Sequence, residues 1–247
     1  MHECQKTLWS NHLTKQVRNL SNAIFVATLA IDPFQAVIND KEFVETRGVV
    51  NGSNVEVILR APATKEGPST HLKKKKRDDL ILLSGELQLA EKNTPDVGTA
   101  TVVVYSCSDA TKEQFINEVT IVGRFCKDYK EAEKSCARNV VCNRYRRVQG
   151  QEKPEQISDF FRIRGFGAWK ERIMKSSKGA LVELNGVLTE EKDKAGKPYP
   201  VVKLRKLRTF QKGSGGQADP AQEKAASGYE PSQFLGLDDD NMPTSNW

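Results

Sequence analysis

The chain has 247 residues, and its 38 Lys and Arg outnumber its 32 Asp and Glu, which gives a formal net charge of +6. This length accommodates one large domain or two small ones, and 38% hydrophobic residues are enough for a packed core. No apolar run approaches the ~18 residues that a membrane span needs. Charged residues also interrupt the N-terminus before a signal peptide can form. We therefore expect a cytoplasmic protein that does not interact with membranes.

The charge is divided unevenly along the chain. Residues 1–110 are neutral overall, residues 111–210 carry a net charge of +10, and residues 211–247 carry −4. A basic section of this size favours a polyanionic partner. The five cysteines form neither CxxC-like pairs nor a cysteine–histidine pattern typical of zinc sites, so we expect reduced cytosolic thiols, no metal site and no cofactor.

The first predicted element is a short amphipathic helix over residues 8–20. Trp9, Leu13, Val17 and Leu20 recur there at helical spacing. We assign this helix to an N-terminal extension, residues 1–21, that packs on the following domain. Further along the chain, the basic run from Lys73 to Arg77 is interpreted as a solvated loop, and contacts to phosphates are the alternative for it.

Three segments of the first half recur in the same order in the second half. "NAIFVATLAIDPF" aligns with "NEVTIVGRFCKDY" at an offset of 95 residues, and "VEVILRAPATKE" aligns with "FFRIRGFGAWKE" at an offset of 105. A third pair of segments, at an offset of 101, places Gly85 opposite Gly186. This pattern indicates an internal duplication of one structural unit.

Within each unit, short strand patterns alternate with turn residues. "DKAGKPY" predicts a hairpin, and "GAWKERIMKSSKGA" predicts a helix because Trp169, Ile173 and Met174 share helical spacing. Gly186 suits a barrel strand that bends sharply. Strands, one helix and a closing hairpin are typical of a small OB-type barrel.

The predicted fold class is all-β with short helices, built as two tandem OB-fold barrels. The first, degenerate OB fold covers residues 22–110, and the second covers residues 111–210. Residues 211–247 are rich in Gly, Ala, Ser, Gln and Pro, so we expect a disordered tail with an acidic tip.

The stretch "DFFRIRGFGAW" predicts a strand with two different faces. Alternate residues of a strand share a face, so Phe161 and Ile163 suit the core. The opposite face carries aromatic and cationic side chains in alternation: Phe160, Arg162, Arg164 and Phe166. Such a face suits a ligand that is flat and anionic. An ordinary core strand is the alternative.

Three segments together resemble the bacterial single-stranded-DNA-binding proteins of the OB-fold family: "INEVTIVGRF", "DFFRIRGFGAW" and "KGALVELNGVLTEEKDKAGKPYPVVKLRKLRTF". The resemblance covers residues 117–210 well and residues 22–106 faintly. It implies a nucleoid-associated, non-enzymatic protein that binds and protects single-stranded DNA during replication, recombination and repair. A chain with two such folds resembles the family members that pair as homodimers, so that four OB folds surround the DNA.

The resemblance and the residue types together assign the contacts to single-stranded DNA. Aromatic side chains stack on bases, and a basic groove follows the phosphates. The assigned residues are Arg144, Tyr145, Arg146, Phe160, Arg162, Arg164, Phe166, Tyr199, Lys203 and Arg205. Trp169 is assigned to the core. The alignment places Val55 and Ala61 opposite the two phenylalanines, so the first copy is expected to have lost most of its base stacking and to serve dimerisation or spacing.

The end of the chain resembles the partner-binding tip of the same family, in which an acidic run precedes an apolar-Pro-Phe end. The corresponding residues are Asp238, Asp239, Asp240, Met242, Pro243 and Trp247. The resemblance implies that this tip recruits replication and repair proteins, although the terminal aromatic residue is displaced by several positions. The alternative is a solubilising acidic end that competes with DNA for the basic groove.

Two other classes of function stay open at this point. One is an OB-fold adaptor for proteins or RNA that no longer coats DNA, which the neutral first copy favours. The other is an enzyme, for which the sequence offers no nucleophile–base pair, no Walker A loop and no metal-ligand spacing. We expect no enzymatic activity and no catalytic residues.

Overall fold

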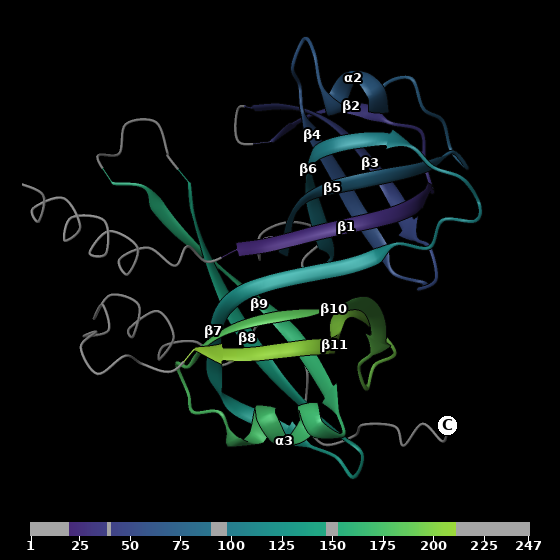
Figure 1. The fold of residues 1–247 in the computed structure, drawn as a ribbon. Coiled ribbons are helices and arrows are strands. Elements are labelled where there is room, and N and C mark those ends of the chain that lie inside the picture. The colour runs from purple at the N-terminus through teal and green to yellow at the C-terminus, as the bar shows by residue number, and fades with distance from the viewer. Residues whose placement is uncertain (1–19, 39–40, 90–97, 147–152, 211–247) are drawn as a thin grey trace, which may run out of the picture.

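The computed structural model describes residues 20–38, 41–89, 98–146 and 153–210 (Figure 1). The predicted N-terminal helix lies outside these residues except for its last residue, Leu20, which begins a strand instead of ending a helix. The acidic tail lies outside them. The first half contains β1 (Leu20–Leu29), β2 (Phe34–Ile38), β3 (Lys41–Val50), β4 (Glu56–Pro62), α2 (Pro68–Leu72), β5 (Leu80–Leu89) and β6 (Ala100–Asp109). The second half contains β7 (Asn117–Glu131), β8 (Ser135–Arg146), β9 (Glu155–Phe166), α3 (Ala168–Lys175), β10 (Leu181–Lys192) and β11 (Pro198–Phe210). No helix in the described part of the chain is long and apolar enough to cross a membrane.

The strands close into two five-stranded barrels of the same topology. In the first barrel the ring runs β1–β3–β4–β6–β5 and back to β1, and in the second it runs β7–β8–β9–β11–β10 and back to β7. Counted in chain order within each barrel, the third and fifth strands pair in parallel (β4 with β6, and β9 with β11), and all other pairs are antiparallel. A helix precedes the fourth strand, β5 or β10. This is the OB topology, and the predicted fold class is confirmed. The first barrel carries β2 as an additional strand on β3.

The two barrels are joined through their first strands. β1 pairs antiparallel with β7, and the two strands run side by side between the barrels (Figure 1). Ala23 of β1 pairs with Val119 of β7. The two residues are equivalent because Ala23 also pairs with Gly85 in the fourth strand of the first barrel, and Val119 also pairs with Gly186 in the fourth strand of the second. The pairing is therefore symmetric about Ala23 and Val119, as in a two-fold interface between identical subunits.

The predicted duplication is thus present, but its first two sequence alignments are shifted by one residue. The third alignment holds at Gly85 and Gly186 and is shifted by one residue in the strand that follows them. The equivalence of Ala23 and Val119 is an offset of 96 residues, whereas matching the two asparagines gave 95. In the third strands, Leu59 pairs in parallel with Val102, and Ile163 pairs in the same way with Val202. Leu59 and Ile163 are therefore equivalent, and the offset between the third strands is 104 instead of 105. A shift of one residue exchanges the two faces of a strand, so the correction changes which residues are compared.

Gly85 and Gly186 hold the same position in the two barrels, as predicted. The pairing register shifts by one residue at each of them, which is the signature of a β-bulge. An added Cβ would lie 2.1 Å from the carbonyl oxygen of Val103 at Gly85, and 2.3 Å from that of Lys203 at Gly186. Only glycine allows the fifth strand to approach this closely, so these residues permit the sharp bend that closes each barrel.

The predicted helix and hairpin of the second barrel are also confirmed. α3 ends at Lys175, and Trp169 packs against the core as predicted. The buried Arg138 of β8 donates hydrogen bonds to the carbonyl oxygens of Ile173 (3.0 Å) and Ser176 (2.6 Å), which ties the C-terminal end of α3 to the barrel. The hairpin between β10 and β11 turns at Asp193, whose carboxylate accepts a hydrogen bond from the Lys197 N–H at 2.7 Å.

Candidate functional site

The two faces of β9 are distributed as the sequence predicts. Phe161 and Ile163 point into the main core of the second barrel. Phe166, at the end of the opposite face, is 45% exposed. Phe160 lies on this opposite face too, but it is only 7% exposed because it packs in a small separate cluster with Cys126 and Val141. Of the two phenylalanines assigned to base stacking, Phe166 alone presents a largely open ring.

Between the two phenylalanines lies a polar section of the same face. Arg162 and Asn139 are directly opposed in the pairing of β9 with β8. Nε of Arg162 and Oδ1 of Asn139 are both buried without a hydrogen-bond partner. Burial also lowers the pKa of the Arg162 guanidinium. Because buried polar groups are normally satisfied, this opposed pair is an exception among the site residues.

Arg164 is held by the β10–β11 hairpin. Its guanidinium donates a hydrogen bond to the carboxylate of Glu191 at 2.5 Å and another to the Ser135 hydroxyl at 3.2 Å. The hydroxyl of Tyr199 donates to the same Glu191 carboxylate at 3.2 Å, and burial raises the pKa of Tyr199. The Glu191 carboxylate of the hairpin therefore contacts two of the predicted site residues, Arg164 and Tyr199.

The far end of β8 adds Tyr145, which is 60% exposed, between two arginines that are paired with carboxylates. Arg146 donates to Glu155 at 2.8 Å, and Arg144 donates to Asp159 at 2.9 Å. Asp159 is almost fully buried, and this burial raises its pKa to about 6 although Arg144 acts in the opposite direction. Its second carboxylate oxygen accepts a hydrogen bond from the backbone N–H of Leu89 in the first barrel.

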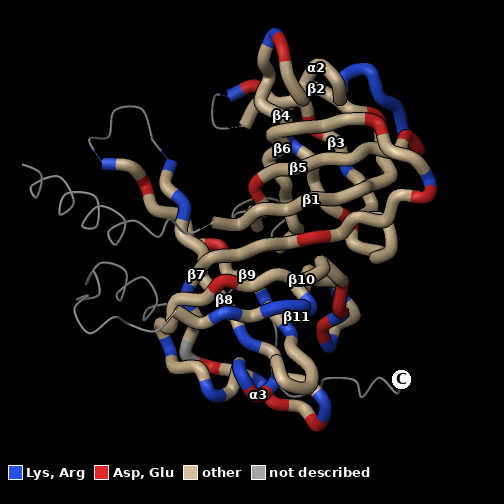
Figure 2. The backbone as a smooth tube through the Cα atoms, viewed as in Figure 1, with Lys and Arg blue, Asp and Glu red and all other residues tan. Residues whose placement is uncertain are grey.

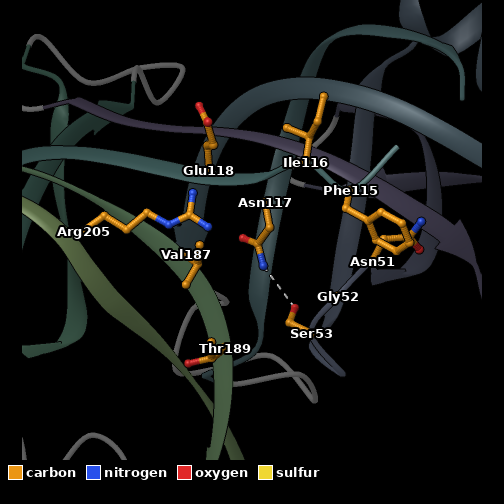
Figure 3. Close-up of a pocket in the computed structure, with 10 residues that line it drawn as sticks. All are labelled: Asn51, Gly52, Ser53, Phe115, Ile116, Asn117, Glu118, Val187, Thr189 and Arg205. Atoms are coloured by element: carbon orange, nitrogen blue, oxygen red, sulfur yellow. Dashed lines mark hydrogen bonds between the residues drawn. The ribbon is translucent and has the colours of Figure 1, made fainter. Parts of the chain in front are cut away.

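The exposed cations of the site lie on β11. Lys203 and Arg205 are both exposed, and the basic residues of this strand form a row along the second barrel (Figure 2). Arg205 also lines an open pocket of about 330 Å³ between the two barrels (Figure 3). The pocket includes Phe115, which is 71% exposed. Sequence reasoning missed Phe115 because it lies in a connecting segment with no strand or helix pattern.

The ten predicted residues are therefore not equally available. The structure places Phe160, Arg162 and Arg164 on the same face of β9 and connects Arg164 with Tyr199 through Glu191 of the β10–β11 hairpin. It places Tyr145 with its two arginines at the far end of β8. Tyr145, Phe166, Lys203 and Arg205 are exposed. Their contacts with a ligand stay a prediction.

The equivalent face of the first barrel has a different chemistry. With the corrected offset, the residues opposite Phe160 and Phe166 are Glu56 and Pro62, and the earlier match to Val55 and Ala61 is wrong because those two residues are buried in the core. Arg60 pairs with Glu45 at 2.6 Å, and Arg47 pairs with Glu56 at 2.8 Å. This face of β4 carries no aromatic ring. The lack of base stacking in the first barrel stays a prediction.

The basic run Lys73–Arg77 follows α2 and forms part of a loop, as predicted. Lys75 pairs with Asp109, and the backbone N–H of Arg77 donates to the Asp32 carboxylate at 2.7 Å. Asp109 itself has a lowered pKa because of its hydrogen bond to Lys75. The loop is thus anchored by acidic neighbours at these two residues.

The described cysteines do not form a metal site. Within residues 20–38, 41–89, 98–146 and 153–210, no group of three or more His, Cys, Asp or Glu side chains converges. Cys136 and Cys142 lie in the main core, whereas Cys126 lies in the outer cluster with Phe160. Burial raises the pKa of Cys126 to about 11 and that of Cys142 to about 12, so both are neutral thiols near pH 7.

The sequence matches no protein-family model and no curated protein. Solved structures match the fold over most of the chain. The wild-type single-stranded DNA binding protein from Thermus aquaticus matches with a TM-score of 0.57 and 13% identity, covering 83% of this chain and 100% of that chain. A deletion variant of the same protein matches with a TM-score of 0.59 and 12% identity, covering 82% and 100%. At these identities the likeness shows a shared fold with two OB barrels in one chain.

Proposed function

We propose that this protein binds single-stranded DNA, mainly through its second barrel and without strong sequence preference. The observation that carries the proposal is the combination of exposed aromatic rings and exposed cations on one barrel, at Tyr145, Phe166, Lys203 and Arg205. Stacking platforms beside a basic groove are the general features of single-strand binding. The fold of the Thermus single-stranded DNA binding protein supports the same conclusion by analogy.

The difference between the two barrels supports a division of roles. On the third strand of the first barrel, Glu56 and Arg60 are paired with charged residues of β3, whereas the corresponding strand of the second barrel carries Phe166 at its end. We propose that the first barrel acts as a structural unit that holds the second through β1 and β7. A homodimer with four barrels is part of this proposal, and light scattering of the purified protein tests it.

Binding to single strands is expected to weaken with salt. If Arg162, Arg164, Lys203 and Arg205 contact phosphates, the logarithm of the affinity should fall against the logarithm of salt concentration with a slope of about −0.7 per contact. The measurement is a titration of the purified protein with labelled single-stranded DNA, duplex DNA and RNA across salt. Affinity that does not change with salt, or that favours duplex, would contradict the proposal, and a preference for RNA would favour the adaptor alternative.

Glu191 is expected to limit the affinity for single-stranded DNA, because its carboxylate forms an ion pair with the guanidinium of Arg164. A phosphate must compete with this carboxylate, so Glu191→Gln should tighten single-strand binding by about 5-fold at low salt, equivalent to roughly 1 kcal/mol. The effect should shrink as salt rises because screening weakens both interactions.

The matched control for this variant is Glu190→Gln, which removes the same charge from the neighbouring residue of β10. If the two variants tighten binding equally, the gain comes from net charge alone and the specific role of Glu191 is wrong.

We also propose that the protein acts in replication, recombination and repair and recruits partner enzymes through Asp238–Asp240 and the residues after them. The sequence of the tail supports this, and its structure lies outside the described residues. Pull-downs with chains 1–247, 1–243 and 1–230 test it: partner capture should be lost in chain 1–230, and chain 1–243 shows whether Trp247 is needed. Equal capture by all three chains would contradict the proposal.

A further inference from the structure

We propose that the pocket between the two barrels holds one nucleotide of a single strand, with its base stacked on Phe115 and its phosphate beside Arg205. This inference rests on the proposed function and adds a binding residue outside both barrels. It gives the segment that connects the barrels a direct role in binding.

The pocket is built from three parts of the chain that meet where the barrels join. The turn between β3 and β4 contributes Asn51–Ser53, the start of β7 and the residues before it contribute 115–118, and β10 and β11 contribute Val187 and Arg205. Its volume of about 330 Å³ falls at the small end of the ~300–1,000 Å³ range of ligand pockets. This size suits a single nucleotide better than a larger ligand.

Phe115 is an exposed ring on a fixed backbone. The carbonyl oxygen of Ile116 accepts a hydrogen bond from the Val26 N–H at 2.8 Å, which binds the segment to the first barrel. Asn117 binds it to the second barrel, because its side chain donates to the Leu188 carbonyl oxygen at 2.8 Å and accepts from the Leu188 N–H at 2.9 Å. The residues directly after Phe115 are therefore held by both barrels.

The turn of the first barrel supports this arrangement. Asn117 also donates to the Ser53 hydroxyl at 3.2 Å, and Gly52 lies so near that an added Cβ would be 4.0 Å from Cδ1 of Phe115. Despite these neighbours the ring is 71% exposed. An apolar ring left open on a restrained backbone loses little entropy when a flat ligand stacks on it.

The charges of the pocket are arranged for one base and one phosphate. In Figure 3 the guanidinium of Arg205 and the ring of Phe115 lie on opposite sides of Asn117. Arg205 belongs to the exposed basic row of β11, so a strand that follows Lys203 and Arg205 arrives at this pocket. The carboxylate of Glu118 adds an acceptor for a base amino group and disfavours a second phosphate.

The test uses the full-length chain and two substitutions of Phe115. Phe115→Ala should weaken binding of a labelled oligothymidylate by roughly 5- to 150-fold, the change expected for the loss of one stacked base. Phe115→Trp should keep the affinity, and the fluorescence it adds to that of Trp9, Trp169 and Trp247 should be quenched by single-stranded DNA. The matched control is Phe34→Ala, because Phe34 is also exposed, at 46%, but lies on β2, which contributes no residue to the pocket.

The outcomes separate this inference from the proposed function. If the wild-type chain binds single strands with the expected salt dependence but Phe115→Ala behaves like Phe34→Ala, the pocket is not a subsite and only this inference is overturned. Unquenched fluorescence in Phe115→Trp, with binding intact, overturns it equally. If the wild-type chain does not bind single strands at all, both proposals are wrong.

Discussion

Replacing Tyr145 and Phe166 together by alanine is expected to weaken binding of single-stranded DNA by about 2–6 kcal/mol, because each ring stacks on one base at ~1–3 kcal/mol. The two rings are 60% and 45% exposed, and they extend from the second and third strands of the second barrel. Their removal should leave the free energy of unfolding within about 0.5 kcal/mol of the wild type, as is usual for surface positions.

The first barrel offers a matched pair for this experiment. Tyr105 and Phe34 are 59% and 46% exposed, so the double alanine variant removes the same two ring types at nearly the same exposure. Fluorescence anisotropy with labelled oligonucleotides measures both affinities. Equal losses in the two double variants would mean that the barrels share the binding, and no loss in either would exclude stacking at Tyr145 and Phe166.

Phe160→Ala should behave differently from Phe166→Ala. The Phe160 ring is 7% exposed in its cluster with Cys126 and Val141, so its removal leaves a cavity and should cost about 3 kcal/mol of folding stability. Urea denaturation separates this effect from binding. A stable Phe160→Ala variant with weakened binding would show that the ring leaves its cluster to contact DNA.

The fold was predictable because its determinants are local. Alternation in "DFFRIRGFGAW" correctly separated Phe161 and Ile163 from the outer residues, and Gly186 correctly indicated the bend of the fourth strand. The alignment of the two copies failed by one residue because it matched identical letters, two asparagines, instead of matching core faces. An alignment that matched buried positions with each other would have placed Ala23 opposite Val119.

The candidate site was less predictable because it depends on distant partners. Glu191 is 27 residues from the Arg164 that it pairs with, and Asp159 bonds to Leu89 across 70 residues and two barrels. Neither pairing follows from local periodicity. Phe115 belongs to a segment with no periodic pattern at all, and it became a candidate only because the closed barrels place it in the same pocket as Arg205.

Gly186→Ala is expected to lower the free energy of unfolding by about 3 kcal/mol or more, since the new Cβ can be accommodated only if two strands move apart. In the present geometry the Cβ would lie 2.3 Å from the carbonyl oxygen of Lys203 and 2.8 Å from Cγ1 of Val202. The first of these neighbours is backbone, so no change of side-chain rotamer relieves the contact. Lys203 belongs to the predicted binding strand, so affinity for single strands should fall as well.

Gly48→Ala is the control for this variant, because its Cβ would lie 3.3 Å from side-chain carbons of Ala27 and Leu59, which can shift slightly. Gly85→Ala repeats the clash in the first barrel, at 2.1 Å from the carbonyl oxygen of Val103. Urea denaturation should show a large loss in the free energy of unfolding for Gly85→Ala and Gly186→Ala and a small one for Gly48→Ala.

If only Gly186→Ala also weakens single-strand binding at low denaturant, then the second barrel carries the binding and the bend at Gly186 positions its basic strand. If Gly186→Ala is as stable as the wild type, the close approach of β10 and β11 is not required for the barrel to close.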